Sequence, residues 1–90
     1  MISFSELWEK CESIYQDNNE DSSVILDELN MKVNLFKTLN YIQNISEEEL
    51  QKVKSRTIGE ILFTLTKLSM KENINVFESL SMAYQNKIII

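Results

Sequence analysis

The chain has 90 residues with no Pro, one Gly and one Cys, and its 14 acidic and 9 basic side chains give a formal net charge of −5. General nucleic-acid binding depends on a dense basic surface, so this balance argues against a nucleic-acid partner. The sequence also lacks His, which removes the commonest general base and most zinc ligands and leaves carboxylates as the plausible catalytic groups. Few turn formers and many helix formers predict an all-α protein.

The length fits a single domain, residues 1–90, although a chain of this size buries only about 60–65% of its unfolded surface. Cys11 is the single cysteine and cannot form an internal disulfide, as expected for a protein of the reducing cytosol. It lies on an apolar stripe, which indicates that it packs as a small buried hydrophobic residue. No apolar run approaches the ~18 residues of a membrane span, and the first residues carry no basic side chain. We therefore expect a cytoplasmic protein without a signal peptide or a membrane partner.

A capping box, Ser-Phe-Ser-Glu, opens the first amphipathic segment, which predicts a helix from about Phe4 to Gln16. Trp8 and Tyr15 share its apolar stripe, where core packing explains them and stacking on a base is the alternative. A polar, acidic break follows at 17–21, and the two serines after it can cap a second helix from about Val24 to Ile42.

A second capping box, Ser-Glu-Glu-Glu, follows a short connection at 43–45 and predicts a third helix from about Ser46 to Lys71. The spacing from Asn75 to Glu78 suits the start of a fourth helix that ends near Lys87. Short connections favour antiparallel neighbours, so the expected architecture is a compact four-helix bundle.

The segment 24–42 is apolar around roughly 220° of its helical projection, more than a surface helix needs. The third helix carries an additional small stripe, Phe63 and Met70, beside Gly59. Both patterns indicate burial on two sides, and we interpret them as a homodimer built on the helices at 24–42 and 46–71. A central helix within a monomer is the alternative.

Glu28 and Lys32 lie one helical turn apart inside this apolar arc. An unpaired charge is costly to desolvate, so a metal, each other or a second subunit must satisfy them. Carboxylates on facing helices are how helical bundles hold Mg²⁺. The candidate metal ligands are Asp27 and Glu28, followed by Glu60 at the border of the third helix's stripe; Asp27 projects away from the arc.

Four stretches carry a family resemblance: Ile58-Gly59-Glu60-Ile61-Leu62, Leu65–Leu68, Ile74–Leu80 and Ala83–Lys87. Through them the chain resembles, over about residues 22–87, the MazG-type all-α nucleoside triphosphate pyrophosphatases, relatives of phosphoribosyl-ATP pyrophosphatase and dimeric dUTPases. In that family a Glu-Glu-x-x-Glu helix and a later Glu-x-x-Asp helix together hold Mg²⁺ and the triphosphate. The resemblance therefore implies a helical, nucleotide-related protein with magnesium as cofactor if it is active.

Laid onto this chain, the family's first motif falls on residues 27–31 and the second on residues 57–60. Met31 and Thr57 depart from the motifs, and a site reduced to Glu28 and Glu60 should bind Mg²⁺ weakly. We interpret Lys32 as an electrostatic substitute for the metal. The alternative is that Lys32 extends to the surface with its stem against the apolar arc.

A basic strip on the third helix projects to one side within ~100° and consists of Lys52, Arg56, Lys67 and Lys71. It could hold the phosphates of a nucleotide. A solvated face with pairs four residues apart, such as Arg56 with Glu60, explains it equally well.

Three functional hypotheses follow. The favoured one is a MazG-like domain with an incomplete metal site and no cofactor, which serves as a dimerising, nucleotide-sensing or partner-binding module. The second is an active Mg²⁺-dependent pyrophosphohydrolase, in which Asp27, Glu28 and Glu60 hold the metal and hydroxide attacks a phosphorus of the nucleotide. The third is an acidic helical adaptor that binds a protein partner's helix near the first helix or the apolar tail 88–90.

Overall fold

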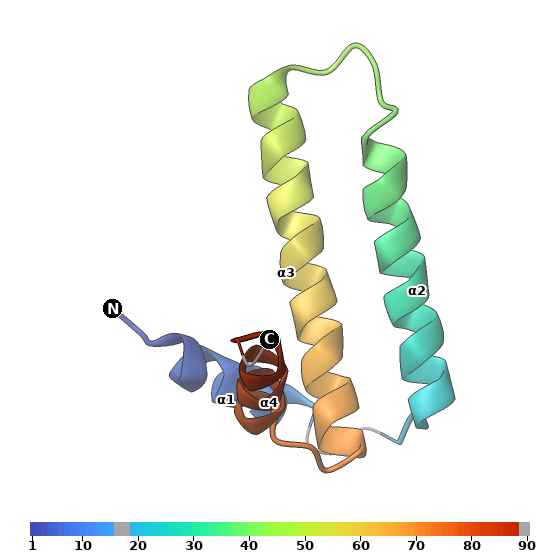
Figure 1. The fold of residues 1–90 in the computed structure, drawn as a ribbon. Coiled ribbons are helices and arrows are strands. Elements are labelled where there is room, and N and C mark those ends of the chain that lie inside the picture. Colours follow the sequence, from blue (N-terminus) through green and yellow to red (C-terminus); the bar gives the residue numbers. More distant parts are fainter. Residues whose placement is uncertain (16–18, 89–90) are drawn as a thin grey trace.

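A computed structural model of the chain describes residues 1–15 and 19–88. Over these ranges it holds four helices and no strand, which confirms the all-α prediction: α1 (Phe4–Ile14), α2 (Ser22–Leu39), α3 (Glu47–Lys71) and α4 (Val76–Ile88). α2 and α3 pack side by side as a long antiparallel hairpin (Figure 1). α1 packs against the part of α3 that is far from the hairpin turn. No helix within the described ranges has both the length and the apolar character needed to cross a membrane.

Side-chain caps start α1, α3 and α4 where the sequence pattern places them. The hydroxyl of Ser3 accepts from the backbone N–H of Glu6 at 3.2 Å, and that of Ser46 accepts from the N–H of Glu49 at 3.1 Å. Asn75 Oδ1 accepts from two backbone N–H groups of α4, at 2.9 and 3.1 Å. Each cap satisfies a donor that the first helical turn leaves unpaired, which is why these boundaries are readable from local sequence.

The start of α2 corrects the sequence prediction. Its cap is Asp21 rather than one of the serines that follow, and the Asp21 carboxylate accepts from Val24 N at 3.0 Å and from the Ser23 hydroxyl at 2.7 Å. These two hydrogen bonds, the one from Ser23 first, hold the pKa of Asp21 below its ordinary value. Ser22 and Ser23 therefore lie in the first turn of the helix, because a carboxylate is a stronger acceptor at the positive end of the helix dipole.

The turns at both ends of α3 use Asn in place of Gly. α2 ends at Leu39, short of the predicted Ile42, and Asn44 in the connection has φ 66°. Asn73 takes φ 54° directly after Glu72, the C-cap of α3. Asn adopts this left-handed conformation more readily than other non-glycine residues because its short side chain can bond locally.

The core of the described residues is small. Its buried hydrophobic side chains are Trp8, Ile25 and Leu39, and α3 also buries Lys67 and several hydroxyl residues. Trp8 and Phe4 of α1 contact the ring of Phe77 at the start of α4, with centroid distances of 6.3 Å each. Aromatic contacts of this geometry fasten α1 to the junction of α3 and α4.

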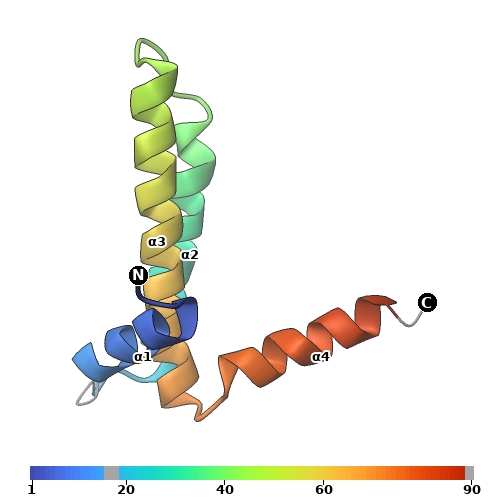
Figure 2. The same ribbon diagram turned by 90° about the vertical axis from the view of Figure 1, so that its left-hand side faces the viewer.

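α4 leaves this junction and extends away from the hairpin (Figure 2). None of its residues is buried. The structure therefore shows only part of the compact four-helix bundle expected from the sequence. The connection between α3 and α4 is short, but α4 does not fold back along α3 (Figure 2).

Candidate functional site

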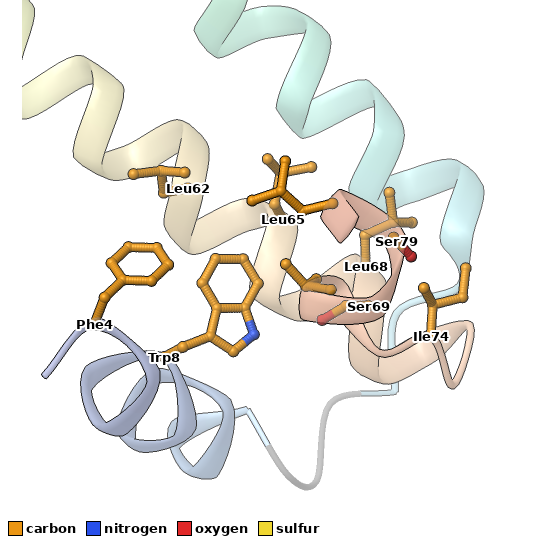
Figure 3. A pocket seen from close by; sticks show the side chains of 10 residues that line it. Phe4, Trp8, Leu62, Leu65, Leu68, Ser69, Ile74 and Ser79 are labelled. Atoms are coloured by element: carbon orange, nitrogen blue, oxygen red, sulfur yellow. The ribbon is translucent and has the colours of Figure 1, made fainter. Parts of the chain in front are cut away.

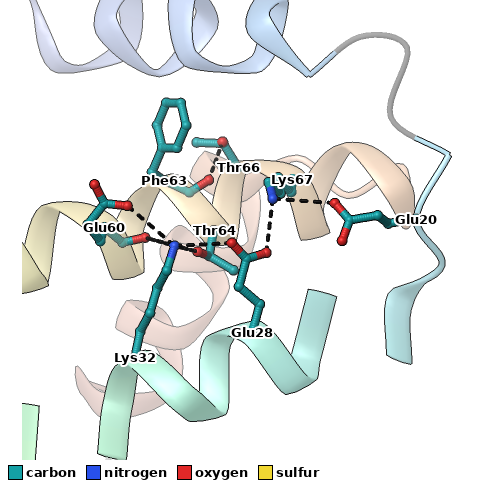
Figure 4. Close-up of polar contacts among 8 residues, drawn as sticks. All are labelled: Glu20, Glu28, Lys32, Glu60, Phe63, Thr64, Thr66 and Lys67. Carbon is teal, nitrogen blue, oxygen red and sulfur yellow. Dashed lines mark hydrogen bonds and ion pairs between the residues drawn. The ribbon is translucent and has the colours of Figure 1, made fainter. Parts of the chain in front are cut away.

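The predicted charged pair lies between the two helices of the hairpin (Figure 4). Lys32 Nζ is 3.3 Å from Glu28 Oε1 on its own helix and 3.3 Å from Glu60 Oε2 on α3. It also donates to the hydroxyl of Thr64 at 2.7 Å, and that hydroxyl donates to the Glu60 carbonyl at 3.0 Å. With the Glu60 carbonyl at 3.5 Å, the three N–H groups of the ammonium have four acceptors within reach. The Lys32 side chain is 20% exposed.

A second ammonium extends the same network. Lys67 Nζ lies 2.9 Å from Glu28 Oε2 and 3.4 Å from Glu20 Oε1, and it stands 4.5 Å from the centroid of the Tyr15 ring. Its side chain is only 8% exposed. We call this set the lysine network: Glu20, Glu28, Lys32, Glu60, Thr64 and Lys67.

Glu28 is the centre of the lysine network because each of its two oxygens accepts from a different lysine. The hydrogen bond from Lys67, followed by the hydrogen bond and charge of Lys32, holds the pKa of Glu28 below its ordinary value against the opposing effect of burial. Burial also acts to lower the pKa of Lys67, but the hydrogen bond and charge of Glu28 outweigh it, and that pKa is raised. Both shifts favour the charged pair.

The residues at this place do not fit a magnesium site. Mg²⁺ requires oxygen ligands in a close octahedron at about 2.0–2.1 Å, whereas both oxygens of Glu28 and one of Glu60 already accept from ammonium groups. Asp27 is exposed on α2. Within residues 1–15 and 19–88, no three or more His, Cys, Asp and Glu side chains gather in a way that could hold a metal ion.

The two positions that depart from the family motif also lack the chemistry of a metal ligand. Met31 is 67% exposed. Thr57 is buried, and its hydroxyl donates to the carbonyl of Val53 in the same helix at 2.9 Å. Neither side chain joins the lysine network in the described contacts.

The basic strip on α3 divides in the structure. Lys52, Arg56 and Lys71 are exposed, while Lys67 is buried against α2 with its ammonium committed to Glu20 and Glu28. Only the three exposed residues retain the character of the strip described from the sequence. The reason is tertiary: α2 packs over the second half of α3 at the level of Lys67.

Sequence reasoning missed Lys67, Glu20 and Thr64 as members of the lysine network. A usable signal existed for Lys67, since it follows Glu60 by seven residues, or two helical turns, and so lies on the same side of α3. Glu20 precedes α2 and carries no periodic signal, and the approach of Tyr15 depends on how α1 crosses α3.

A second site is an apolar hollow between three helices, the α1–α4 groove (Figure 3). It has a volume of about 450 Å³. Phe4 and Trp8 form one wall. The opposite sides come from the leucines of α3 and from the first turns of α4: Leu62, Leu65, Leu68, Val76 and Leu80. Ser69 and Ser79 also line it.

Comparison with known proteins assigns the chain to no family. No protein-family model matches it, and no curated protein or solved structure is significantly similar to it. The lysine network and the α1–α4 groove are therefore the features from which a function must be argued.

Proposed function

We propose that the chain is a non-catalytic relative of the MazG-type pyrophosphatases, in which the ammonium of Lys32 takes the place of the divalent cation. The observation that carries the proposal is the position of Lys32 Nζ, 3.3 Å from both Glu28 and Glu60. These are the two acids that match the family's metal motifs. A tethered ammonium supplies positive charge to both of them permanently, whatever the concentration of metal in solution.

The charge balance of the lysine network supports this proposal. Three carboxylates (Glu20, Glu28, Glu60) face two ammonium groups (Lys32, Lys67), which leaves a formal charge of −1. A triphosphate needs cationic groups that clamp its oxygens and neutralise the charge of the transition state. A network that is already paired and slightly negative offers neither.

We further propose that the chain acts as a homodimer in which α2 and α3 of two copies complete the four-helix arrangement. A folded monomer of 10.6 kDa exposes about 5,500 Å² by the usual size scaling, whereas this chain exposes 7212 Å². The excess is about 1,700 Å² per chain, and two copies that bury it reach the 2,000–5,000 Å² typical of obligate dimers. Exposed apolar side chains on α2, such as Met31 and Leu35 at 67% and 52%, suit such an interface.

A turnover assay tests the catalytic half of the proposal. The protein is incubated with a panel of nucleoside triphosphates and Mg²⁺ or Mn²⁺, and pyrophosphate release is measured beside a variant that combines Met31→Glu, Lys32→Ala and Thr57→Glu. We expect no release above background from the wild type and tighter Mg²⁺ binding by the variant. Circular dichroism checks that the variant, whose position 57 is buried, remains helical.

The proposal fails if the wild type hydrolyses a nucleotide and Glu60→Gln abolishes the activity. A matched control is Lys52→Ala, which removes an exposed ammonium from α3 outside the lysine network. It should leave Mg²⁺ binding unchanged, whereas Lys32→Ala alone should raise it.

A second candidate function is an acidic adaptor that binds an amphipathic helix of another protein. The α1–α4 groove favours it, since an apolar hollow between helices is the usual seat of such a helix. This function requires the groove to stay open in solution, so a protein that remains monomeric at micromolar concentration supports it over the homodimer.

A further inference from the structure

α4 carries an apolar face that, beyond Phe77, the described part of the chain leaves largely exposed. Leu80, Tyr84 and Ile88 follow one another at four-residue spacing and Phe77 precedes them by one turn, so all four lie on one side of the helix. We call them the α4 stripe. Leu80, Tyr84 and Ile88 are 66%, 60% and 54% exposed, and α4 points away from the hairpin (Figure 2).

The α4 stripe and the α1–α4 groove are one continuous surface. Leu80 belongs to the stripe and also lines the groove. On the other side, Leu62 lines the groove, and Ile58 one turn earlier on α3 is 45% exposed. The groove is therefore joined to the apolar face of the hairpin as well as to the outer half of α4.

The α4 of the same chain cannot fill the groove, because Val76 and Leu80 in its first turns already form one wall. The chain thus presents a concave apolar surface together with a convex apolar helix, and neither can reach the other. Two copies related by a two-fold axis can each place the convex helix in the other's concave surface, so that both contacts form at once.

We propose that the outer half of α4 from a second copy lies in the α1–α4 groove, and that the two copies exchange this contact reciprocally. This inference rests on the proposed homodimer and specifies one of its surfaces; it does not depend on whether the chain is catalytic. The occupant is this chain because its excess exposed surface matches the area that an obligate dimer buries.

The charges near the groove also favour α4 of a second copy as its occupant. The only charged residue of the sequence between 79 and 88 is Lys87. Beside the groove, Glu9 and Glu12 of α1 border a smaller hollow that also involves Trp8 and Val76. The incoming half of α4 thus brings a cation to an acidic rim, whereas an acidic partner helix would be repelled there.

The first test measures the mass of the protein in solution by sedimentation velocity over a concentration series. The variant carries Tyr84→Lys and Ile88→Lys, which place charges on the α4 stripe where they are exposed in the single chain. The control carries Gln85→Lys and Asn86→Lys, which add the same charge away from the stripe, and this charge is not repelled by the acidic rim. We expect a dimer for the wild type and the control, and a dissociation constant about 100-fold higher for the variant, since burying a charge in an apolar groove is strongly unfavourable.

The possible outcomes distinguish the groove contact from the proposed homodimer. A dimer that the stripe variant does not weaken overturns the groove contact while the homodimer through α2 and α3 stands. A wild type that is monomeric at micromolar concentration overturns both, and it points to a foreign helix as the occupant. Nucleotide turnover by the wild type would overturn the non-catalytic assignment and leave the groove contact intact.

A second test places α4 beside the groove directly. Trp8 is the only Trp of the chain, so its emission reports on the groove. Copies with Trp8→Phe, Cys11→Ser and Gln85→Cys, labelled with a quencher at the new thiol, are mixed with unlabelled wild-type copies, so that quenching can only occur between copies. We expect quenching from position 85 and none from a label at Glu47→Cys. Mixed dimers without quenching from position 85 overturn the inference.

Discussion

The α2–α3 hairpin and α4 are both built from amphipathic helices with short connections, but only the hairpin finds its partner within the chain. The hairpin is closed by charged and hydroxyl side chains as well as by apolar ones, and Lys67 is almost completely buried in it. α4 also has an apolar face, but none of its residues is buried. The difference shows that amphipathicity predicts a buried face without saying which chain covers it.

The largest expected effect is the loss of the charge that holds the hairpin together. Glu28→Gln leaves Lys67 buried without its nearest carboxylate and weakens the contact of Lys32, so we expect the free energy of unfolding to fall by about 2–4 kcal/mol, less than for a fully buried pair because Glu28 retains some exposure. Urea denaturation at fixed protein concentration measures the change. Asp27→Asn, at the exposed neighbouring position, is the control and should shift stability by no more than about 0.5 kcal/mol.

Equal losses for the two substitutions would contradict the central place of Glu28. A further contrast is Lys67→Met, which replaces the buried ammonium with an apolar side chain of similar length. It should destabilise less than Glu28→Gln, because it leaves no buried charge without a partner and Glu28 keeps Lys32.

The pH dependence of the free energy of unfolding should follow the titration of Glu28 in acid and of Lys67 in base. The pKa of Glu28 lies below its ordinary value of 4.5 in the folded protein, so its contribution to stability is present above that value and is lost as the pH falls through the folded pKa. The pKa of Lys67 lies above 10.5, so its contribution is present below that pH and is lost as the pH rises through the folded pKa. Between these limits the stabilising effect of the pair should be constant.

Thermal unfolding of the wild type and Glu28→Gln from pH 3 to pH 8 measures the acid limb. We expect the difference between them to shrink as the pH falls below about 4.5. A difference that stays constant down to pH 3 would mean that Glu28 is not stabilised as a carboxylate by the two lysines.

Local chemistry explains how much of this molecule could be predicted from its sequence. The four helices, and the caps at Ser3, Ser46 and Asn75, depend on residues within one turn of each other, so a single sequence contains them. Glu28 and Lys32 are also one turn apart, and their burial was visible as charges inside an apolar arc. These features were predictable because each is settled within a few residues.

Features that depend on the crossing of helices were beyond the sequence. Lys67 was grouped with exposed basic residues because helical spacing gives a direction around α3 but not the position of α2. The cap of α2 was misplaced for a smaller reason: three adjacent polar residues, Asp21 and the two serines, compete for one role. The direction in which α4 leaves α3 depends on the turn at Asn73, whose left-handed backbone no periodic pattern encodes.

The smallest expected effects on stability come from removing the N-terminal helix caps of the two regions. Ser46→Ala removes the cap of α3, and since α3 is packed against both α1 and α2, we expect the global free energy of unfolding to fall by about 1 kcal/mol. Asn75→Ala removes the equivalent cap of α4. In the isolated chain α4 buries no residue, so this change should speed hydrogen exchange of α4 amides and leave the urea midpoint of the hairpin nearly unchanged.

Dimerisation turns this comparison into a sensitive test. If the outer half of α4 is covered by a second copy, its amides become protected as protein concentration rises, and Asn75→Ala then weakens dimerisation because an uncapped helix must be ordered before it docks. Hydrogen exchange at two concentrations, with Ser55→Ala in the middle of α3 as the control, measures both effects. Exchange of α4 that is equally fast at every concentration would show that α4 stays uncovered, and the helix packing of the described residues would then be that of α1, α2 and α3.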